Sequence, residues 1–413
     1  MTTAWLDTDL ARWVETCRDD RELSGLAAAA TVTFGIRADD RTALFGFHGG
    51  ELAEPADDPD FVLVAADADW SEFFQPVPPP AHQNFFGMLM RVPGARVEGS
   101  ELAMAQHAHI VRRVLELGRE AISGPLTAPA AHPARGKAHL RPGYVRISVR
   151  GEPVEIFYEE AGAGPDVLLL HTAGADARQY HELMADPALA SRCRLVAFDL
   201  PGHGRSGLLP GVVPGGYSLT TDQYATAVLA VIDALGLVSP VVSGSSMGGE
   251  ICLELAHRAP HALGGVIACE ASDRVPGRKV PWAKHPAVNE STFVPEWVYG
   301  LMAPQSPERC RREVWWGYSQ GGFGTFAGDI DFYSGDWDGR ERVGEIDTSR
   351  CPVIMMTGEY DYSCTPAMSA ATARKIPGAV FWPMPDLGHF PMAENPPLFA
   401  EHFAAALDRL GIP

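Results

Sequence analysis

The most constraining feature of this sequence is a short glycine-rich segment between a predicted strand and a predicted helix. The segment GSSMGG, residues 244–249, follows the apolar run PVVS and precedes the helical run EICLELAHRA. A G-x-S-x-G pattern in this context predicts a tight strand-to-helix turn that exposes the serine hydroxyl. Ser246 is therefore the candidate nucleophile. The amide of Met247, at the helix N-terminus, is a candidate donor to an oxyanion.

The segments around this turn alternate between predicted strands and predicted helices. The strands are YVRISVR, PVEIFYEE, DVLLLH, RLVAFDL, PVVSG, GGVIACE, PVIMMTGEYD and AVFWPM, and helices are expected from about Thr221, from about Gly248, around 366–376 and from about 395. This alternation predicts an α/β fold with a mostly parallel sheet that helices cover on both faces. One aromatic-rich segment, about 272–345, interrupts the alternation, and we expect it to form an inserted cap.

A serine hydroxyl needs a base, and the base needs a group that fixes its tautomer. Asp361 ends the strand segment PVIMMTGEYD, and His389 lies in DLGHFP, just after AVFWPM. Loops at the carboxyl ends of parallel strands meet at one edge of the sheet. The sequence therefore predicts a catalytic triad of Ser246, His389 and Asp361. A second oxyanion donor is expected from the loop after DVLLLH, where we assign the amide of Ala173.

These motifs together resemble the α/β-hydrolase superfamily, over residues from about 144 to 413. FDLPGHGRS at 198–206 resembles the family's D-x-P-G-x-G-x-S loop, GEYD at 358–361 its acid loop, and GHF at 388–390 its histidine motif. Two departures stand out. Thr172 occupies a position where many members carry glycine. The alternative acid position of some members, after the sixth strand, holds Glu270 or Asp273.

The resemblance implies hydrolysis of a carboxylic ester in a small apolar substrate through an acyl-enzyme. Thioester or carbon–carbon bond cleavage would use the same triad, whereas family members with an elbow aspartate, such as epoxide hydrolases, are disfavoured by Ser246. A ligand-binding receptor or a lipid-carrier protein that retains a triad is the alternative from another class. No metal or organic cofactor is implied. The side chains expected to line the substrate pocket are His171, Thr172, Trp282, Trp297, Trp315, Trp316, Tyr318 and Phe323.

The length of the chain predicts a separate N-terminal domain, because 413 residues exceed the usual size of one hydrophobic core. The Pro-, Gly- and Ala-rich residues 124–143 read as a linker. Within residues 1–123, ALFGFHGG and DFVLVAAD read as strands, DWSEFF as a short helix, and the residues after the capping Ser100 as one long helix. This small α+β domain faintly resembles the sterol-carrier-protein-2-like fold, so a lipid-binding role stands beside a packing or dimerisation role.

Charge and cysteine content restrict partners and compartment. A net charge of -19 disfavours binding to nucleic acid and to anionic membranes. The N-terminus lacks the basic start and apolar core of a signal peptide, and no apolar run approaches the ~20 residues that span a bilayer. The 7 cysteines include no C-x-x-C pair, which favours buried free thiols in a reducing compartment. We therefore expect a cytoplasmic protein, with a homodimer left open.

Overall fold

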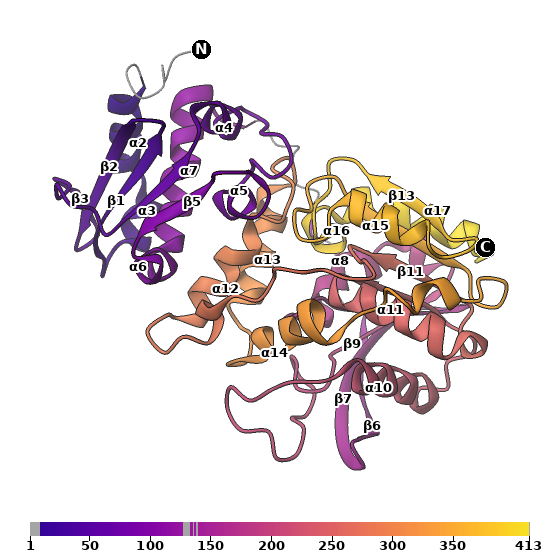
Figure 1. Ribbon diagram of the computed structural model, residues 1–413. Helices are drawn as coiled ribbons and strands as arrows, with labels where there is room; N and C mark the ends of the chain where they lie inside the picture. Colours follow the sequence, from indigo (N-terminus) through magenta and orange to yellow (C-terminus); the bar gives the residue numbers. More distant parts are fainter. Residues whose placement is uncertain (1–8, 127–132, 135, 138, 413) are drawn as a thin grey trace.

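The computed structural model describes residues 9–126, 133–134, 136–137 and 139–412, and places them in two sheets with their own helices (Figure 1). Residues 1–8 of the predicted first domain, residues 127–132, 135 and 138 of the predicted linker, and residue 413 lie outside the described residues. In Figure 1 the helices α12 and α13, drawn in orange, lie between the N-terminal sheet and the larger C-terminal half.

The N-terminal sheet has the strand order β3-β2-β1-β4-β5. Its central strands β1 and β4 are parallel, and the other neighbours are antiparallel. The strands are β1 (Thr31–Ala38), β2 (Arg41–His48), β3 (Glu51–Ala53), β4 (Phe61–Ala65) and β5 (Arg96–Gly99). The helices are α2 (Leu10–Asp19), α3 (Arg21–Leu26), α4 (Asp67–Phe73), α5 (Phe85–Arg91), α6 (Glu101–Gln106) and α7 (Ala108–Ser123). The predicted strands and short helix correspond to β2, β4 and α4.

The long helix predicted after Ser100 is divided into α6 and α7, so that prediction was wrong in its length. The Ser100 hydroxyl accepts a hydrogen bond from the amide of Ala103 at 3.1 Å and caps α6, as expected. His107 then leaves the helical conformation, with φ of -117° and ψ of 16°. Its ring Nδ1 lies 2.8 Å from the carbonyl oxygen of Ala103 and competes with the backbone for that acceptor. The chain therefore changes direction before α7 packs on α2, where the Trp13 indole donates to the carbonyl oxygen of Val114 at 2.8 Å.

The C-terminal sheet has the strand order β13-β12-β11-β10-β8-β9-β7-β6. Strands β13 to β9 in this order are parallel neighbours, while β7 and β6 are antiparallel at one edge. The strands are β6 (Arg141–Val149), β7 (Glu152–Gly162), β8 (Asp166–Leu170), β9 (Arg194–Phe198), β10 (Val241–Ser245), β11 (Gly265–Cys269), β12 (Val353–Gly358) and β13 (Val380–Met384). The predicted mostly parallel sheet is confirmed.

Helices cover both faces of this sheet, because successive strand residues point to opposite sides. In β8, Leu168 and Leu170 join one buried cluster, and Val167 and Leu169 join the other. The first face is covered by α10 (Thr221–Ala234), α11 (Met247–Arg258) and α15 (Pro366–Ala373). The second is covered by α8 (His181–Met184), α9 (Pro187–Ala190) and α17 (Pro396–Arg409), with the short α16 (Pro391–Glu394) and the 3-10 helix η1 (Ala177–Tyr180). The 3-10 helix η2 (Pro260–Ala262) packs against the first cluster through Ala262.

The residues between β11 and β12 form the aromatic-rich insertion. It contains η3 (Pro281–Lys284), α12 (Glu290–Tyr299), α13 (Glu308–Tyr318), α14 (Thr325–Asp331), the π-helical turn η4 (Phe332–Asp336) and η5 (Val343–Glu345). We call residues 272–345 the cap.

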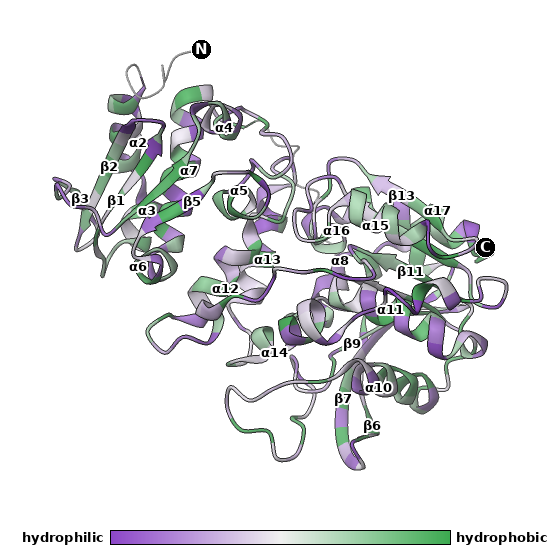
Figure 2. Ribbon diagram, in the orientation of Figure 1, coloured by the Kyte–Doolittle hydropathy of each residue, from purple (hydrophilic) through white to green (hydrophobic). Residues whose placement is uncertain are grey.

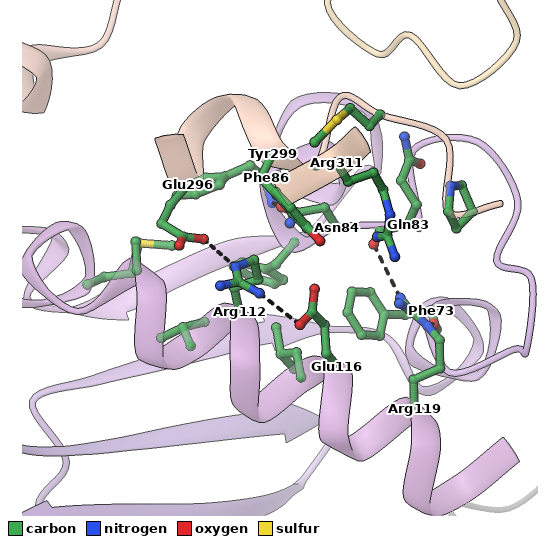
Figure 3. A pocket seen from close by; sticks show the side chains of 18 residues that line it. Phe73, Gln83, Asn84, Phe86, Arg112, Glu116, Arg119, Glu296, Tyr299 and Arg311 are labelled. Atoms are coloured by element: carbon green, nitrogen blue, oxygen red, sulfur yellow. Dashed lines mark hydrogen bonds and ion pairs between the residues drawn. The ribbon is translucent and has the colours of Figure 1, made fainter. Parts of the chain in front are cut away.

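The N-terminal domain is joined to the cap through buried charges and aromatic rings. Figure 3 shows Arg112 of α7 reaching across to Glu296 of α12 and to Glu116 of its own helix, at 2.6 and 2.8 Å. The Phe86 ring of α5 lies 4.8 Å from the Trp297 ring. One buried hydrophobic cluster runs through both domains and the cap. Figure 2 shows hydrophobic and hydrophilic residues on the same helices, such as α7, as expected where one side packs and the other meets solvent.

Two further expectations concern the chain as a whole. All seven cysteines, each within the described residues, are free and buried, as predicted. No helix in the described part of the chain has the length and apolar character that crossing a membrane requires.

Candidate active site

The predicted serine turn is present between β10 and α11. Ser246 has φ of 59° and ψ of -119°, a left-handed conformation that is strained for a residue with a Cβ atom. The flanking glycines are required by close packing: a Cβ at Gly244 would lie 2.4 Å from the carbonyl carbon of Gly248, and one at Gly249 would lie 2.3 Å from the carbonyl oxygen of Cys269. The turn therefore places the Ser246 side chain at the carboxyl edge of the sheet, over the N-terminus of α11.

The structure brings His389 and Asp361 together. His389 Nδ1 lies 2.7 Å from Asp361 Oδ2, and both residues are buried. Asp361 belongs to the loop after β12, residues 359–364, which we call the acid loop. Its Oδ1 accepts hydrogen bonds from the amides of Ser363 and Cys364 at 2.7 and 3.1 Å. With the carboxylate facing Nδ1, the other ring nitrogen, Nε2, is left to act as a base.

The histidine loop is also tied to the serine turn. The Ser245 hydroxyl donates to the carbonyl oxygen of His389 at 3.1 Å. The amide of Gly388 donates to the buried carboxyl of Glu394, which also accepts from the amide of Ala303 at 3.0 Å. Within the described part of the chain, the Ser246 hydroxyl itself makes no hydrogen bond to a side chain or to the backbone. Such catalytic hydrogen bonds often form only when substrate is bound.

Glu270 joins this group instead of replacing Asp361. It follows β11 with φ of 53° and is fully buried, and both its oxygens lie 3.1 Å from the amide nitrogen of Gly358. Burial, and then the nearby charge of Asp361, raise the pKa of Glu270 well above its usual range, and the two carboxyls share a hydrogen bond. A protonated Glu270 would donate that hydrogen bond to the Asp361 carboxylate. The other residue at the alternative acid position, Asp273, instead pairs with Lys375.

Glu270, Asp361 and His389 also form the one group of side chains, among those the structure describes, whose ligand atoms lie close enough to share a metal ion, within 4.8 Å of one another. Their atoms are already engaged with each other and with backbone amides. This arrangement suits a hydrogen-bonded chain of acid and base more than an open coordination site.

The predicted oxyanion loop after β8 is held by the cap. The amide of Gly174 donates to Asp329 Oδ2 of α14 at 2.7 Å. The Thr172 hydroxyl lies 2.6 Å from the Tyr318 hydroxyl of α13. Among the described groups, neither the amide of Ala173 nor that of Met247 donates a hydrogen bond. The two predicted oxyanion donors are therefore both available.

Asp329 is a residue that the sequence did not reveal. It is fully buried, and it binds His203 Nε2 at 2.7 Å and the Tyr224 hydroxyl. Burial lowers the pKa of His203, but the charge of Asp329 outweighs it, so the net effect is a raised pKa.

Burial and the neighbouring His203 lower the pKa of His171, a predicted pocket residue, to about 4. His171 accepts from the amide of Leu200 at 3.0 Å, which fixes the loop and leaves the ring little freedom to bind substrate.

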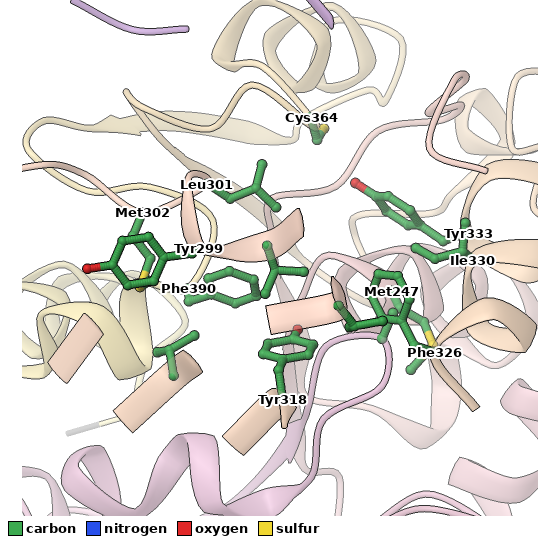
Figure 4. Close-up of a cluster of buried hydrophobic side chains, with 14 of the residues drawn as sticks. Met247, Tyr299, Leu301, Met302, Tyr318, Phe326, Ile330, Tyr333, Cys364 and Phe390 are labelled. Carbon is green, nitrogen blue, oxygen red and sulfur yellow. The ribbon is translucent and has the colours of Figure 1, made fainter. Parts of the chain in front are cut away.

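Figure 4 shows a cluster of buried apolar side chains that includes Met247 and Phe390, the residues that follow Ser246 and His389 in the chain. The Phe390 ring lies 5.0 Å from the His389 ring and 5.5 Å from the Tyr318 ring. The Tyr333 ring lies 6.5 Å from that of His389 on another side. The labelled members of the cluster are Met247, Tyr299, Leu301, Met302, Tyr318, Phe326, Ile330, Tyr333, Cys364 and Phe390.

Only some of the predicted pocket residues lie in this cluster. Tyr318 does, whereas Trp316 is 56% exposed and Phe323 is 60% exposed. Residues two positions apart on a helix point in different directions, so α13 cannot direct both Tyr318 and Trp316 inward. The Trp315 indole donates to Glu296 at 2.8 Å. The two remaining predicted tryptophans contact neighbouring rings, Trp282 that of His285 and Trp297 those of Phe86 and Phe293.

The N-terminal domain holds the acid loop directly. Gln83 Nε2 donates to the carbonyl oxygen of Tyr360 at 2.8 Å. Arg91, at the end of α5, donates through Nε to the carbonyl oxygen of Tyr362 at 2.6 Å and through Nη2 to that of Ser363 at 2.7 Å. These hydrogen bonds hold the backbone of the loop just before and just after the predicted triad acid, Asp361. They join residues far apart in the chain, so no local pattern could have indicated them.

Comparisons with known proteins agree with this geometry. A sequence model described as the alpha/beta hydrolase family matches residues 167–402. A pimeloyl-[acyl-carrier protein] methyl ester esterase of Sodalis glossinidius is 35% identical over 125 residues, which are 29% of this chain and 42% of the relative. The 2-hydroxy-6-oxononadienedioate/2-hydroxy-6-oxononatrienedioate hydrolase 1 of Dechloromonas aromatica is 29% identical over 141 residues, 33% of this chain and 47% of the relative. The chain thus spans less than half the length of these curated relatives.

Solved structures show the same fold at low identity. The enol-lactonase from Burkholderia xenovorans LB400 has a TM-score of 0.56 and 23% identity, covering 64% of this chain and 99% of that one. A thermophilic esterase from Thermogutta terrifontis has a TM-score of 0.53 and 22% identity, covering 65% of this chain and 99% of that one. The family match begins at residue 167 and leaves the N-terminal domain outside it, so the resemblance of that domain to a sterol-carrier-protein-2-like fold stays a prediction.

Proposed function

The chain belongs to the alpha/beta hydrolase family, and from this premise we propose that it is a serine hydrolase that cleaves a carboxylic ester of a small, largely apolar substrate. The observation that carries the proposal is the 2.7 Å hydrogen bond between His389 and Asp361. The backbone of His389 is in turn hydrogen-bonded to Ser245, next to the strained Ser246. These are the parts that serine activation requires.

The proposed cycle begins when Ser246 attacks the ester carbonyl and His389 Nε2 takes the hydroxyl proton. Asp361 stabilises the imidazolium, and the amides of Met247 and Ala173 donate to the oxyanion. The imidazolium then gives its proton to the departing alcohol. Water, activated by the same imidazole, hydrolyses the acyl-enzyme and restores the serine.

The surroundings of the site support an apolar substrate body. Phe390 and Tyr333 lie beside the imidazole and Tyr318 packs on Phe390, so closure of the site around substrate would exclude water and strengthen the electrostatic interactions within it. One relative is named as a methyl ester esterase and another as a hydrolase of 2-hydroxy-6-oxo dioates, which supports acyl chemistry of this kind.

The direct test replaces the nucleophile. Ser246→Ala should lower kcat for p-nitrophenyl butyrate by about 10⁴-fold or more, because residues of a triad act as a unit. It should also abolish labelling by a fluorophosphonate probe. Ser319→Ala is the matched control, since it removes the same atom from a partly exposed serine and loses one neutral hydrogen bond, to the carbonyl oxygen of Trp316, of about 1 kcal/mol.

An unchanged rate in purified Ser246→Ala protein would overturn the assignment. Thioester and carbon–carbon bond cleavage use the same triad, so wild type should be screened on esters, thioesters and vinylogous diketones. If wild-type Ser246 stayed unlabelled by the fluorophosphonate, the receptor or lipid-carrier alternative would be favoured instead.

A further inference from the structure

Arg278 is a buried cation without an anion. Only 2% of this cap residue is exposed. Its guanidinium carbon lies 5.0 Å from the centre of the Trp297 ring, and its Nη1 lies 2.9 Å from the sulfur of Met90 in α5. Nε has no hydrogen-bond partner, and in the part of the chain that the structure describes no carboxylate pairs with the group. A buried charge in this state is strongly unfavourable unless something else binds it.

Two other buried donors beside Arg278 also lack acceptors. They are the Tyr362 hydroxyl and the Trp297 indole N–H. The Tyr362 ring packs tightly under α5, since a Cβ at Gly87 would lie 2.9 Å from it. Burial lowers the pKa of Arg278, and Tyr362 is the group that opposes this most, as expected for close neighbours. Among the described residues, the N-terminal domain, the acid loop and the cap therefore enclose three unused donors, which are Nε of Arg278, the Tyr362 hydroxyl and the Trp297 indole N–H.

We propose that these three donors form a subsite for a carboxylate of the substrate, so that the substrate has an apolar body and an anionic tail. The inference rests on the proposed hydrolase function. A carboxylate fits best because a planar guanidinium binds its two oxygens in parallel, while the phenol and indole supply neutral donors. A phosphate dianion would need donors for a second negative charge, and the nearby Arg91 already directs its Nε and Nη2 to backbone carbonyl oxygens.

The subsite is connected to the triad through Tyr333. The amide of Arg278 donates to the Ser334 hydroxyl at 3.0 Å. The preceding residue, Tyr333, has its ring 6.5 Å from that of His389, and its hydroxyl lies 3.2 Å from the Ser363 hydroxyl in the acid loop. The backbone of Arg278 thus contacts the segment whose Tyr333 ring faces His389. In this proposal the acyl chain runs along Tyr333 from Ser246 to Arg278.

An alternative is that Arg278 only offsets the nearby charge of Asp361, which also raises the pKa of Arg278. Asp361, however, directs both its oxygens elsewhere, to His389 and to the amides of Ser363 and Cys364. The two explanations differ in one measurable respect. A subsite selects substrates with a carboxylate, whereas a charge-balancing arginine does not.

The experiment compares mono-p-nitrophenyl esters of succinate, glutarate, adipate and suberate with the same compounds capped as methyl esters. At the best chain length, wild type should favour the anionic member in kcat/KM by about tenfold or more, the contribution expected of hydrogen bonds to a charged group. Arg278→Gln should bring this ratio close to one, and Tyr362→Phe, which removes a single oxygen, should reduce it in part. The ratio within each variant cancels any general loss of activity. Arg274→Gln, which removes a cap arginine bound to the carbonyl oxygens of Gly335 and Trp337, is the matched control and should keep the wild-type ratio.

A binding measurement separates this inference from the proposed function. Calorimetric titration of the Ser246→Ala protein with the same pairs should show about tenfold tighter binding of the anionic member, and the added Arg278→Gln change should remove the difference. If Ser246→Ala shows the preference but wild type hydrolyses none of the esters, the subsite stands and the proposed reaction falls. Equal or weaker binding of the anionic member at every chain length would overturn the subsite.

Discussion

The contact between Arg91 and the acid loop makes the hydrolase site depend on the N-terminal domain. In Arg91→Met the side chain keeps its approximate length but loses both hydrogen bonds to the carbonyl oxygens of Tyr362 and Ser363. Hydrogen bonds to a charged group contribute about 1.5–3 kcal/mol each, so the loop would lose up to about 3–6 kcal/mol of support. Asp361 lies beside these anchors. We expect kcat to fall by about 10- to 100-fold, the effect of misplacing a catalytic group by about 1 Å.

The assay is hydrolysis of p-nitrophenyl butyrate. In Arg91→Met, KM should stay within about twofold of wild type, because the substrate contacts themselves are intact. The value of kcat/KM should therefore fall by about the same factor as kcat. Arg96→Met is the control: that guanidinium pairs with Glu98 on the surface of the same domain. An Arg91→Met enzyme with wild-type kcat would refute the reasoning.

Two further predictions concern buried carboxyl groups. Glu270→Gln should retain most of the activity, since an amide can replace the neutral acid that the raised pKa implies, whereas Glu270→Ala should lower kcat by about tenfold or more, because it removes the acceptor of the Gly358 amide and one partner of Asp361. Equal losses in both variants, measured with p-nitrophenyl butyrate, would contradict a protonated Glu270. The pair of His203 and Asp329 should make stability depend on pH: the pKa of His203 is raised on folding, so its contribution is complete below the unfolded pKa of about 6.5 and is lost as pH rises through the folded value. Urea unfolding from about pH 6 to about pH 9 should show this decline, and Asp329→Asn should flatten it.

Local sequence patterns predicted the parts of the site that local structure determines. Ser246 is recognisable because the turn needs small residues on both sides of it, as the packing of Gly244 and Gly249 shows. Asp361 and His389 are recognisable because each follows a buried strand of a parallel sheet, and the ends of such strands meet. The same logic predicted the sheet. Successive side chains of a strand point to opposite faces, so a strand that is buried on both faces is a continuous apolar run.

The remaining features depend on contacts between distant segments. Arg91 and Arg278 are ordinary arginines in the sequence, and only the docking of α5 against the acid loop and the cap gives them partners or leaves them without one. The aromatic content of the cap suggested a pocket but not which rings face it. Trp316 lies beside Trp315 in the sequence, yet the turn of α13 directs it to solvent.

The buried hydrophobic cluster that runs through the N-terminal domain, the cap and one face of the larger sheet has a consequence for how the protein melts. Phe86 belongs to the N-terminal domain and Trp297 to the cap, and their rings are in contact. Separating the N-terminal domain from the cap would therefore expose both rings to water. Neither half can then lose its structure without removing apolar cover from the other. On heating, the chain should come apart in one cooperative transition, although its sequence reads as two domains joined by a linker.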